Sequence, residues 1–306
     1  MNLRYDEDFV EEAVRLCAAG RCKQIASLQV PRFNREREKL YSILESDERN
    51  AAFFALHLEW FREWGLEKLL INGLREFPLL TQRLKVLAFR KPRGKNDEGS
   101  ELYVNETHEC NGVVAMRPER FTAEEELHEF LRHELMHLHD MLDSGFGYEP
   151  ELPTTALSLS QHRVARERYR LCWDVSIDGR LTRRGMRTVA TKEQRWVEFS
   201  AGFAFWTEAR QQEVFEFLWG NLTPTHQVLV NLICDPRGVQ VVESPRPGAP
   251  CPLCGFPTFA WAPPGSLEEH TVLAITSEFP QWRSERGVCS RCAAIYRVNQ
   301  KQFACV

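Results

Sequence analysis

The segment HELMH, residues 133–137, places two histidines and a glutamate at a spacing that suits a metal centre. Residues four apart lie on the same face of a helix, so the imidazoles of His133 and His137 can bind one metal ion. The carboxylate of Glu134 lies beside them and can take a proton from a metal-bound water. Because a bound zinc ion lowers the pKa of that water to about 7, this segment predicts a hydrolytic zinc site with Glu134 as the general base.

Acidic residues downstream of HELMH are candidates for the third zinc ligand, which a catalytic site needs beside an open position. Asp174 and Asp178, in the segment RLCWDVSIDGRL, lie four residues apart on a stripe that is otherwise apolar. Glu198 is the only acidic residue in the nearly apolar segment RWVEFSAGFAFW. Burying a carboxylate without a partner is costly, so each needs a metal ion or an arginine, such as Arg195 beside Glu198.

These segments resemble the zincin superfamily of metallopeptidases over residues 100–220. In its gluzincin branch an ExxxD pair follows HExxH; the first acid binds zinc and the second orients a histidine ligand. The resemblance implies that Asp174, in place of the usual Glu, is the third ligand and that Asp178 orients a histidine. Residues 198–202 also resemble a gluzincin segment, EFxAD, with Gly202 in place of its acid, so Glu198 is the alternative third ligand.

Two aspartates closer to HELMH fit a ligand role less well. Asp143 stands where metzincin-like zincins place their third ligand, but those families turn the chain at a glycine where this chain has Asp140. We therefore expect the helix to continue, Asp143 to point away, and Asp140 to support a ligand or cap the helix. The candidates for a group that stabilises the transition state are Tyr148, Tyr169, His162 and His226.

Four cysteines in two CxxC pairs predict a second metal site. Cys251, Cys254, Cys289 and Cys292 can supply four thiolates to a tetrahedral structural zinc, and Gly255 suits the tight turn of a CPxCG knuckle. Two disulfides would suit an exported chain, and the start MNLRYDEDFVEEAV has no signal-peptide pattern. A redox CxxC pair would need a βαβ context, which the sequence does not indicate. The remaining cysteines are expected to be reduced thiols: Cys17, Cys22, Cys110, Cys172, Cys234 and Cys305.

Helices are the main elements predicted to position these residues. Residues 1–90 read as helical, with apolar spacing clearest over 8–19 and 50–74. Before the HELMH helix, 102–104 and 113–116 read as two strands with a turn at Asn111–Gly112. Thr122 and Glu125 match a capping box, which predicts a helix over 123–142. Two long helices are expected within 157–219, separated near 185–190, and a further helix after Pro224.

The fold class that follows is α+β and mostly helical. We expect a helical region over 1–95, a zincin-like domain with a small sheet and the HELMH helix over 96–243, and a small β zinc ribbon over 244–306 after a Pro-rich linker, 244–250. The mean hydropathy is -0.40, and the apolar runs are far shorter than the ~20 residues of a membrane span. The net charge of -4 over 306 residues provides no overall basic field for nucleic acid.

These features predict a cytoplasmic zinc metallopeptidase with one catalytic and one structural Zn²⁺, acting on a peptide or protein. A first alternative is a non-catalytic interaction protein on a degenerate zincin scaffold, because Asp174 and Gly202 depart from the family pattern. A second is a DNA-associated protease similar to the SprT-like family, although nucleic acid is disfavoured and that family's third histidine is missing. Its basic patch would be Arg180, Arg183, Arg184 and Arg187. The ribbon residues Trp261, Phe279, Trp282 and Arg283 could bind a protein partner or form a core around the zinc.

Overall fold

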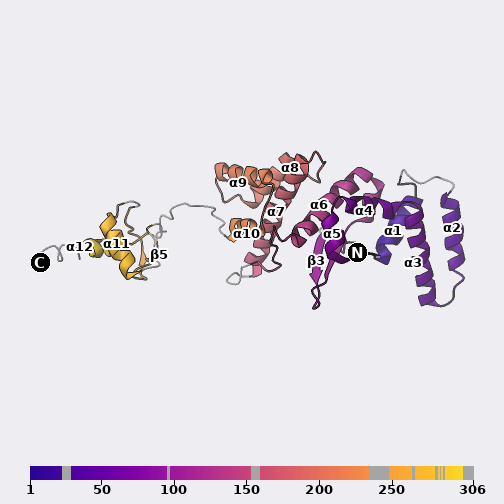
Figure 1. The fold of residues 1–306 in the computed structure, drawn as a ribbon, viewed down its shortest axis with the longest axis horizontal. Helices are drawn as coiled ribbons and strands as arrows, with labels where there is room; N and C mark the ends of the chain where they lie inside the picture. The colour runs from indigo at the N-terminus through magenta and orange to yellow at the C-terminus, as the bar shows by residue number, and fades with distance from the viewer. Residues whose placement is uncertain are drawn as a thin grey trace. The chain divides into compact units, whose positions relative to one another are not determined.

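The computed structural model describes residues 1–22, 29–94, 97–152, 159–234, 248–263, 266–279, 282, 284 and 287–298 (Figure 1). Contacts divide the chain into two compact units, Met1–Pro236 and Arg237–Val306. Each unit is described by itself below. The chain has an α+β fold with mostly helical elements, as the sequence predicts.

The first unit begins with a short strand and five helices. Asp6 caps α1 by accepting a hydrogen bond from the backbone N–H of Phe9 at 3.3 Å, and the helix buries one apolar face. The helical spacing predicted over 50–74 is confirmed, and this stretch forms parts of two helices, because the chain turns at Gly65 with φ +76°, a conformation that favours glycine. The elements are β1 (Asn2–Tyr5), α1 (Glu7–Ala18), α2 (Gln29–Leu40), α3 (Ser46–Glu63), α4 (Leu66–Arg75) and α5 (Pro78–Arg83).

Strand β1 belongs to a four-stranded mixed sheet. The sheet adds β2 (Leu84–Arg90), β3 (Gly99–Val104) and β4 (Cys110–Ala115) in the order β1-β2-β4-β3. The pairs β1–β2 and β2–β4 are parallel, and β3–β4 is antiparallel. The expectation that 1–90 is entirely helical is therefore wrong, and the sheet joins strands from both sides of residue 95. In β2, Leu84, Leu87 and Phe89 are buried, but a register shift between Leu84 and Val86 interrupts the strict alternation that would have indicated a strand.

The hairpin before the HELMH helix turns at a different place from the one predicted. The side chain of Asn105 accepts backbone hydrogen bonds from Thr107 at 3.1 Å and from Glu109 at 2.8 Å, which closes the turn between β3 and β4. Asn111 and Gly112 lie within β4 instead. Gly112 packs closely there, because a Cβ atom at this position would lie 2.9 Å from the terminal methyl of Leu87, which would have to shift.

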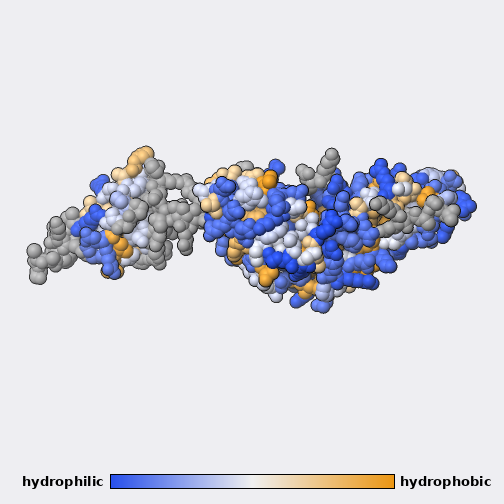
Figure 2. Space-filling model, turned by 90° about the horizontal axis from the view of Figure 1, so that it is seen from above, coloured by the Kyte–Doolittle hydropathy of each residue, from blue (hydrophilic) through white to orange (hydrophobic). Residues whose placement is uncertain are grey.

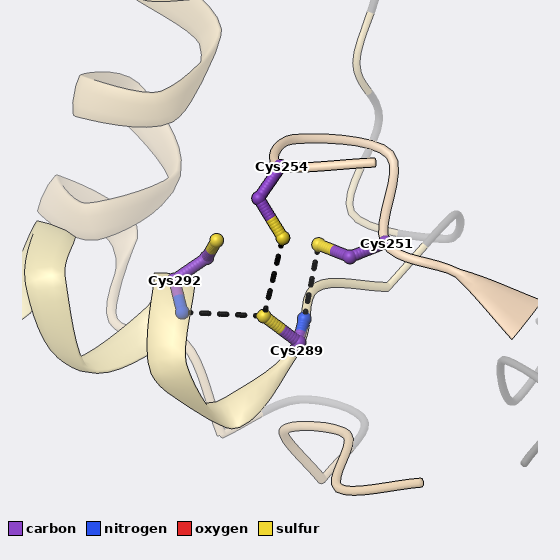
Figure 3. A group of neighbouring side chains, drawn as sticks. All are labelled: Cys251, Cys254, Cys289 and Cys292. Carbon is purple, nitrogen blue, oxygen red and sulfur yellow. Dashed lines mark hydrogen bonds between the residues drawn. The ribbon is translucent and has the colours of Figure 1, made fainter. Parts of the chain in front are cut away.

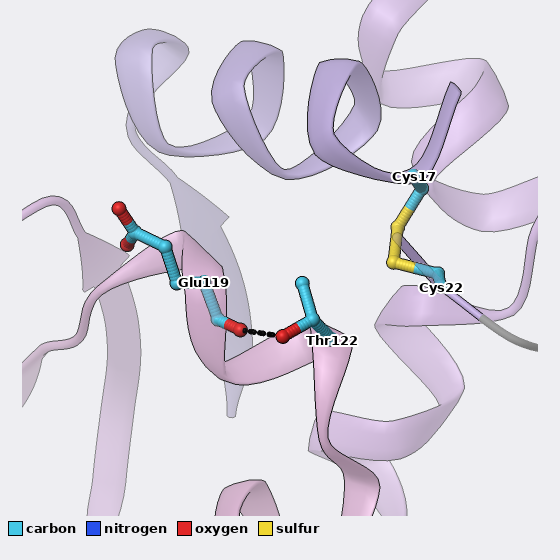
Figure 4. The surroundings of a disulfide bond; sticks show 4 residues. All are labelled: Cys17, Cys22, Glu119 and Thr122. Atoms are coloured by element: carbon cyan, nitrogen blue, oxygen red, sulfur yellow. Dashed lines mark hydrogen bonds between the residues drawn. A yellow bond between two sulfur atoms is a disulfide. The ribbon is translucent and has the colours of Figure 1, made fainter. Parts of the chain in front are cut away.

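The HELMH motif lies on α6 (Glu124–Leu142), which matches the predicted helix. The predicted capping box is wrong. Thr122 ends a 3₁₀ helix, η1 (Pro118–Thr122), and its hydroxyl donates to the carbonyl of Glu119 at 2.7 Å (Figure 4). Ala123 takes the N-cap position without a side-chain hydrogen bond. The first turn of α6 carries three glutamates instead, and negative charge at a helix N-terminus is favourable.

Helix α7 (Leu159–Arg183) packs against α6, α8, α9 and α10 and is the central helix of the second half of the unit (Figure 1). The break predicted near 185–190 is confirmed, as is the helix after Pro224, α10 (His226–Cys234). The remaining segment forms two helices where one was expected, α8 (Lys192–Gly202) and α9 (Glu208–Gly220). The separation arises because Thr207 caps a new helix by accepting from the backbone N–H of Arg210.

The second unit contains more helix than the short strands expected. Its described residues form a two-stranded sheet, β5 (Ala249–Pro250) and β6 (Pro257–Thr258), and two helices, α11 (Glu269–Glu278) and α12 (Ser290–Val298). Trp282 is buried, and Trp261 and Phe279 pack against the same small cluster, which also contains three of the cysteines. These aromatic rings therefore form a core around the cysteines. Arg283 and most of the linker, 244–247, lie outside the described residues.

Two of the six cysteines that were expected to be free thiols form a disulfide. Cys17 at the end of α1 is bonded to Cys22, five residues later (Figure 4). The pairing is possible because the chain turns back after α1 at Gly20, where φ is +77°. Cys110 and Cys172 are free thiols, as expected. The side chains of Cys234 and Cys305 lie outside the described residues.

None of the described helices is both long and apolar enough to cross a membrane. The face of the first unit seen in Figure 2 is mostly hydrophilic, with apolar residues scattered over it. Scattered apolar residues of this kind are usual on protein surfaces.

Gly179 lies at the close contact between α7 and α9, so a substitution at this residue tests the contact. A Cβ atom at this position would lie 2.3 Å from the backbone carbonyl of Trp219, so Gly179→Ala forces the two helices apart. We expect the free energy of unfolding to fall by about 1–3 kcal/mol, measured by chemical denaturation. The control is Gly220→Ala in α9, where nothing lies within 4 Å; equal effects of the two variants would contradict the close approach.

Candidate metal centres

Helix α6 buries the polar residues of HELMH beside its apolar stripe. The relative exposures of His133, Glu134 and His137 are 3%, 4% and 5%. The leucines of the stripe, Leu127, Leu131, Leu135 and Leu138, are fully buried in the main core. Buried polar groups need partners, so the structure around the two imidazoles and the carboxylate determines what they can do.

Helix α7 brings the carboxylate of Asp174 to the two imidazoles. Asp174 Oδ1 lies 2.9 Å from His137 Nε2 and 3.3 Å from His133 Nε2, and the two Nε2 atoms are 3.3 Å apart. Among the described residues, these three form one of two groups whose ligand atoms all lie within 4.8 Å of one another. Two imidazole nitrogens and a carboxylate oxygen are the donor set of many three-ligand zinc sites.

The hydrogen-bond network makes this group suitable for a cation. Asp178 Oδ1 lies 2.9 Å from His133 Nδ1, which is therefore assigned as the N–H donor. The Nε2 lone pair of a neutral His133 then faces the Asp174 oxygen, which is another acceptor. Converging acceptors in a buried site require a proton or a metal ion between them. The residues present thus fit a divalent metal ion.

The hydrogen bonds between the histidines and the aspartates also shift the pKa values of His133 and Asp174. Burial alone would lower the pKa of His133, but its hydrogen bonds to Asp174 and Asp178 outweigh that effect and raise the pKa to about 10. Burial would raise the pKa of Asp174, but hydrogen bonds with His133 and His137 hold it well below its usual range. The site therefore stabilises an ionised carboxylate and a positive charge beside it, which either a protonated imidazole or a bound metal ion can supply.

Of the other acidic candidates, Asp178 supports a ligand and Glu198 lies outside the group. Asp178 is fully buried, and its second oxygen, Oδ2, accepts from Arg195 Nε at 2.6 Å. Glu198 accepts from Arg195 Nη1 at 2.7 Å, and its side chain is 52% exposed. The structure thus groups Asp174, rather than the alternative Glu198, with the two histidines. Asp143 accepts from the backbone N–H of Gly145 and is not part of the group.

Asp140 supports the site through Trp173, a residue that the sequence analysis did not single out. Trp173 Nε1 donates to Asp140 Oδ2 at 2.7 Å, and Arg180 Nη1 donates to Asp140 Oδ1 at 2.9 Å. The ring of Trp173 packs edge-on against His137 with centroids 4.5 Å apart. This indole comes directly before Asp174 in the chain, so one turn of α7 supplies both a candidate ligand and a wall for the histidine.

A cavity of about 250 Å³ opens beside the group. It is lined by Glu134 and His137 from α6, by Tyr169 and Trp173 from α7, and by the start of β3, residues 99–101. Of the four candidate transition-state donors, Tyr148 and Tyr169 line this cavity, whereas His162 and His226 do not. Tyr169 Oη lies 2.6 Å from His226 Nδ1, and burial raises the pKa of Tyr169 and lowers that of His226. Both groups are therefore neutral near pH 7.

The second group comprises the four cysteines that were predicted from their spacing. Their sulfur atoms converge from the loop after β5 and from the start of α12 (Figure 3). Gly255 has φ +73° in the turn after Cys254. Burial opposes ionisation of Cys251, but backbone N–H groups of residues 254, 289 and 253 outweigh it and lower the pKa of this thiol to about 7. Four thiols that face one another in this way fit a tetrahedral zinc ion.

No family model matches this chain, and comparisons with curated proteins and with solved structures find no match either.

The two groups predict that the chain binds two equivalents of zinc, which elemental analysis of the purified protein measures. Replacing His133 and His137 with alanine removes ligands of the first group alone, and replacing Cys251 and Cys254 with serine affects the second alone. We expect each double variant to retain one zinc. A wild-type protein with one zinc that survives loss of the histidines would contradict the site on α6.

The buried ion pair between Asp140 and Arg180 should affect the stability of the fold and its dependence on pH. Burial opposes the ionisation of Asp140, but hydrogen bonds from Arg180 and Trp173 lower its pKa to about 2. Asp140→Asn leaves the guanidinium of Arg180 buried and unpaired, so we expect the free energy of unfolding at pH 7 to fall by about 3–5 kcal/mol. A depressed pKa stabilises the fold above about pH 4, and this contribution is lost as pH falls towards 2.

Chemical denaturation of wild type and variant at pH 7, 4 and 2 measures both effects. The difference between the two proteins should shrink over the acidic range, because protonation removes the ion pair from the wild type. Asp143→Asn is the control, since Asp143 lies outside the buried network, and it should change the free energy of unfolding by at most about 0.5 kcal/mol. A difference that is the same at all three pH values would count against the Asp140–Arg180 pair.

Proposed function

We propose that this protein is a zinc-dependent hydrolase, most specifically a peptidase. The observation that carries the proposal is the convergence of His133, His137 and Asp174 beside a cavity that Glu134 also lines. Three protein ligands leave a fourth coordination position for water or substrate, which is the pattern of catalytic rather than structural zinc sites. A purely structural group would be expected to have a complete set of four ligands.

The residues around the cavity have complementary roles. Zinc, when bound, polarises a substrate carbonyl and activates water for attack. Glu134 lines the cavity and would accept the proton that the attacking water loses and deliver it to the leaving group. Tyr169 is neutral and lines the same cavity. If its oxygen accepts from Nδ1–H of His226, its own hydroxyl proton can be donated to the oxygen on which negative charge develops. Buried Trp173 packs against His137 and holds that ring in place.

A peptide is the substrate class that best fits the surroundings of the site. Strand β3 is the last strand in the sheet order, and residues 99–101 of this strand line the cavity. An extended peptide can add to the edge of a sheet through main-chain hydrogen bonds. A peptide that added to β3 in this way would have a scissile bond next to Glu134 and the candidate metal ligands.

The SprT-like alternative requires a basic face, and three of the four arginines in its patch make other contacts. Arg180 binds buried Asp140, Arg183 donates to the carbonyl of Asn221 at 3.0 Å, and Arg187 pairs with Glu129 at 2.8 Å. The first two contacts join α7 to α6 and to the end of α9, whereas Arg187 follows α7 and its side chain is 70% exposed. We propose a protein or peptide substrate rather than nucleic acid. We also propose a protein partner for the second unit and the cytoplasm as the location.

Hydrolysis of casein and of a peptide library, with Glu134→Gln as the test variant, decides between a peptidase and an interaction protein. General acid–base catalysis contributes about 10²–10⁴-fold, so we expect kcat to fall by that factor while zinc content stays unchanged. Glu126→Gln is the matched control, because this exposed glutamate lies on the same helix. A wild-type protein that holds zinc at His133 and His137 but cleaves nothing would instead favour the non-catalytic interaction protein.

A further inference from the structure

The two oxygens of Asp174 face different partners. Oδ1 points to the histidines, as described above. Oδ2 lies 3.6 Å from Nη1 of Arg195 on α8 and 4.0 Å from Nε of Arg170 on α7. Positive charge therefore lies on the side of the carboxylate that faces away from the imidazoles. This asymmetry holds the carboxylate in one orientation relative to the candidate metal position.

Arg195 contacts both of the carboxylates that touch the imidazoles. Its Nε donates to Asp178 Oδ2 at 2.6 Å, while its Nη1 lies near Asp174 Oδ2 and donates to Glu198. The residue is 8% exposed, and interactions with Asp174 and Asp178 outweigh burial and raise the pKa of its guanidinium. A planar guanidinium can span two carboxylates in a fixed geometry, which the point charge of a lysine cannot do.

The carboxylates around Arg195 differ in exposure. Asp178 is fully buried and Asp174 is 9% exposed, whereas the side chain of Glu198 is 52% exposed. A divalent ion would balance the charges of the two buried aspartates by itself, so Arg195 is not needed for neutrality. Its guanidinium instead donates to Asp178 Oδ2 and lies beside Asp174 Oδ2, and buried carboxylate oxygens need such partners.

We propose that Arg195 is a positioning residue of the metal centre, which holds Asp174 Oδ2 away from the ion so that Asp174 binds through Oδ1 alone. Through Asp178 it also fixes the ring of His133, with Nε2 facing the ion. A carboxylate that binds through one oxygen occupies one coordination position and leaves another open. The proposal rests on the metal centre proposed above, but it does not require that the centre cleaves peptides.

Cobalt substitution tests this role directly, because the visible absorption of Co²⁺ reports the number and geometry of its ligands. The spectrum of the α6 site is obtained by subtracting that of the double variant with His133→Ala and His137→Ala, which is expected to retain only the cysteine site. We expect Arg195→Gln to change this difference spectrum and to weaken zinc binding about 10–100-fold, the usual effect of losing a group that supports a ligand. Arg195→Lys keeps the charge and the fold, and it should restore part of the affinity but not the wild-type spectrum.

A matched control separates positioning from the packing of α8. Gln194 completes the capping box at the start of α8 with Thr191 and contacts neither aspartate in the structure. Gln194→Ala should lower thermal stability slightly and leave the cobalt spectrum and zinc affinity unchanged. The proposal is overturned if both Arg195 variants bind zinc with wild-type affinity and spectrum, if Gln194→Ala changes the spectrum as Arg195→Gln does, or if the wild type shows no histidine-dependent cobalt signal. Loss of peptidase function alone, with these spectra as expected, would refute the proposed function and leave the role of Arg195 intact.

Discussion

The contact between Asp174 on α7 and the two histidines on α6 is the constraint on which the rest of the first unit depends. A carboxylate oxygen lies 2.9 Å and 3.3 Å from two imidazole nitrogens in a buried site. The desolvation cost of these groups is recovered only when a proton or a metal ion balances their charges. The packing of α6 against α7 and the binding of a cation are therefore energetically linked, so the centre cannot be treated as a surface feature of an independent scaffold.

Two buried arginines pair with aspartates on the helices that make this contact. Arg180 binds Asp140 on α6, and Arg195 binds Asp178 on α7. Buried ion pairs add little net stability compared with apolar packing, but breaking one leaves an unpaired charge in the core. Their main physical effect is thus to exclude other side-chain arrangements around the candidate metal ligands.

The sequence predicted the parts of the site whose spacing has a direct geometric meaning. The i,i+4 spacing of His133 and His137 places both on one face of α6, and the CxxC pairs converge as expected. Arg195 was considered only as a partner of Glu198, because its contact with Asp178 joins two helices and has no local signature. The same reason explains the missed role of Trp173. Strand β2 was missed because helical spacing dominated the segments around it, and the Cys17–Cys22 bridge because a reduced state was assumed for lone cysteines.

The two candidate metal groups differ in how many positions the protein itself fills. Four cysteines could complete a tetrahedral shell, and three of them lie in the small core of the second unit, where a bound ion can replace missing apolar packing. The group on α6 and α7 has three candidate ligand atoms, with a cavity beside it and the Glu134 carboxylate on the wall of that cavity. Because chemistry at a metal ion requires a vacant position, the proposed hydrolytic role fits the group with three candidate ligands and the proposed stabilising role fits the cysteine group.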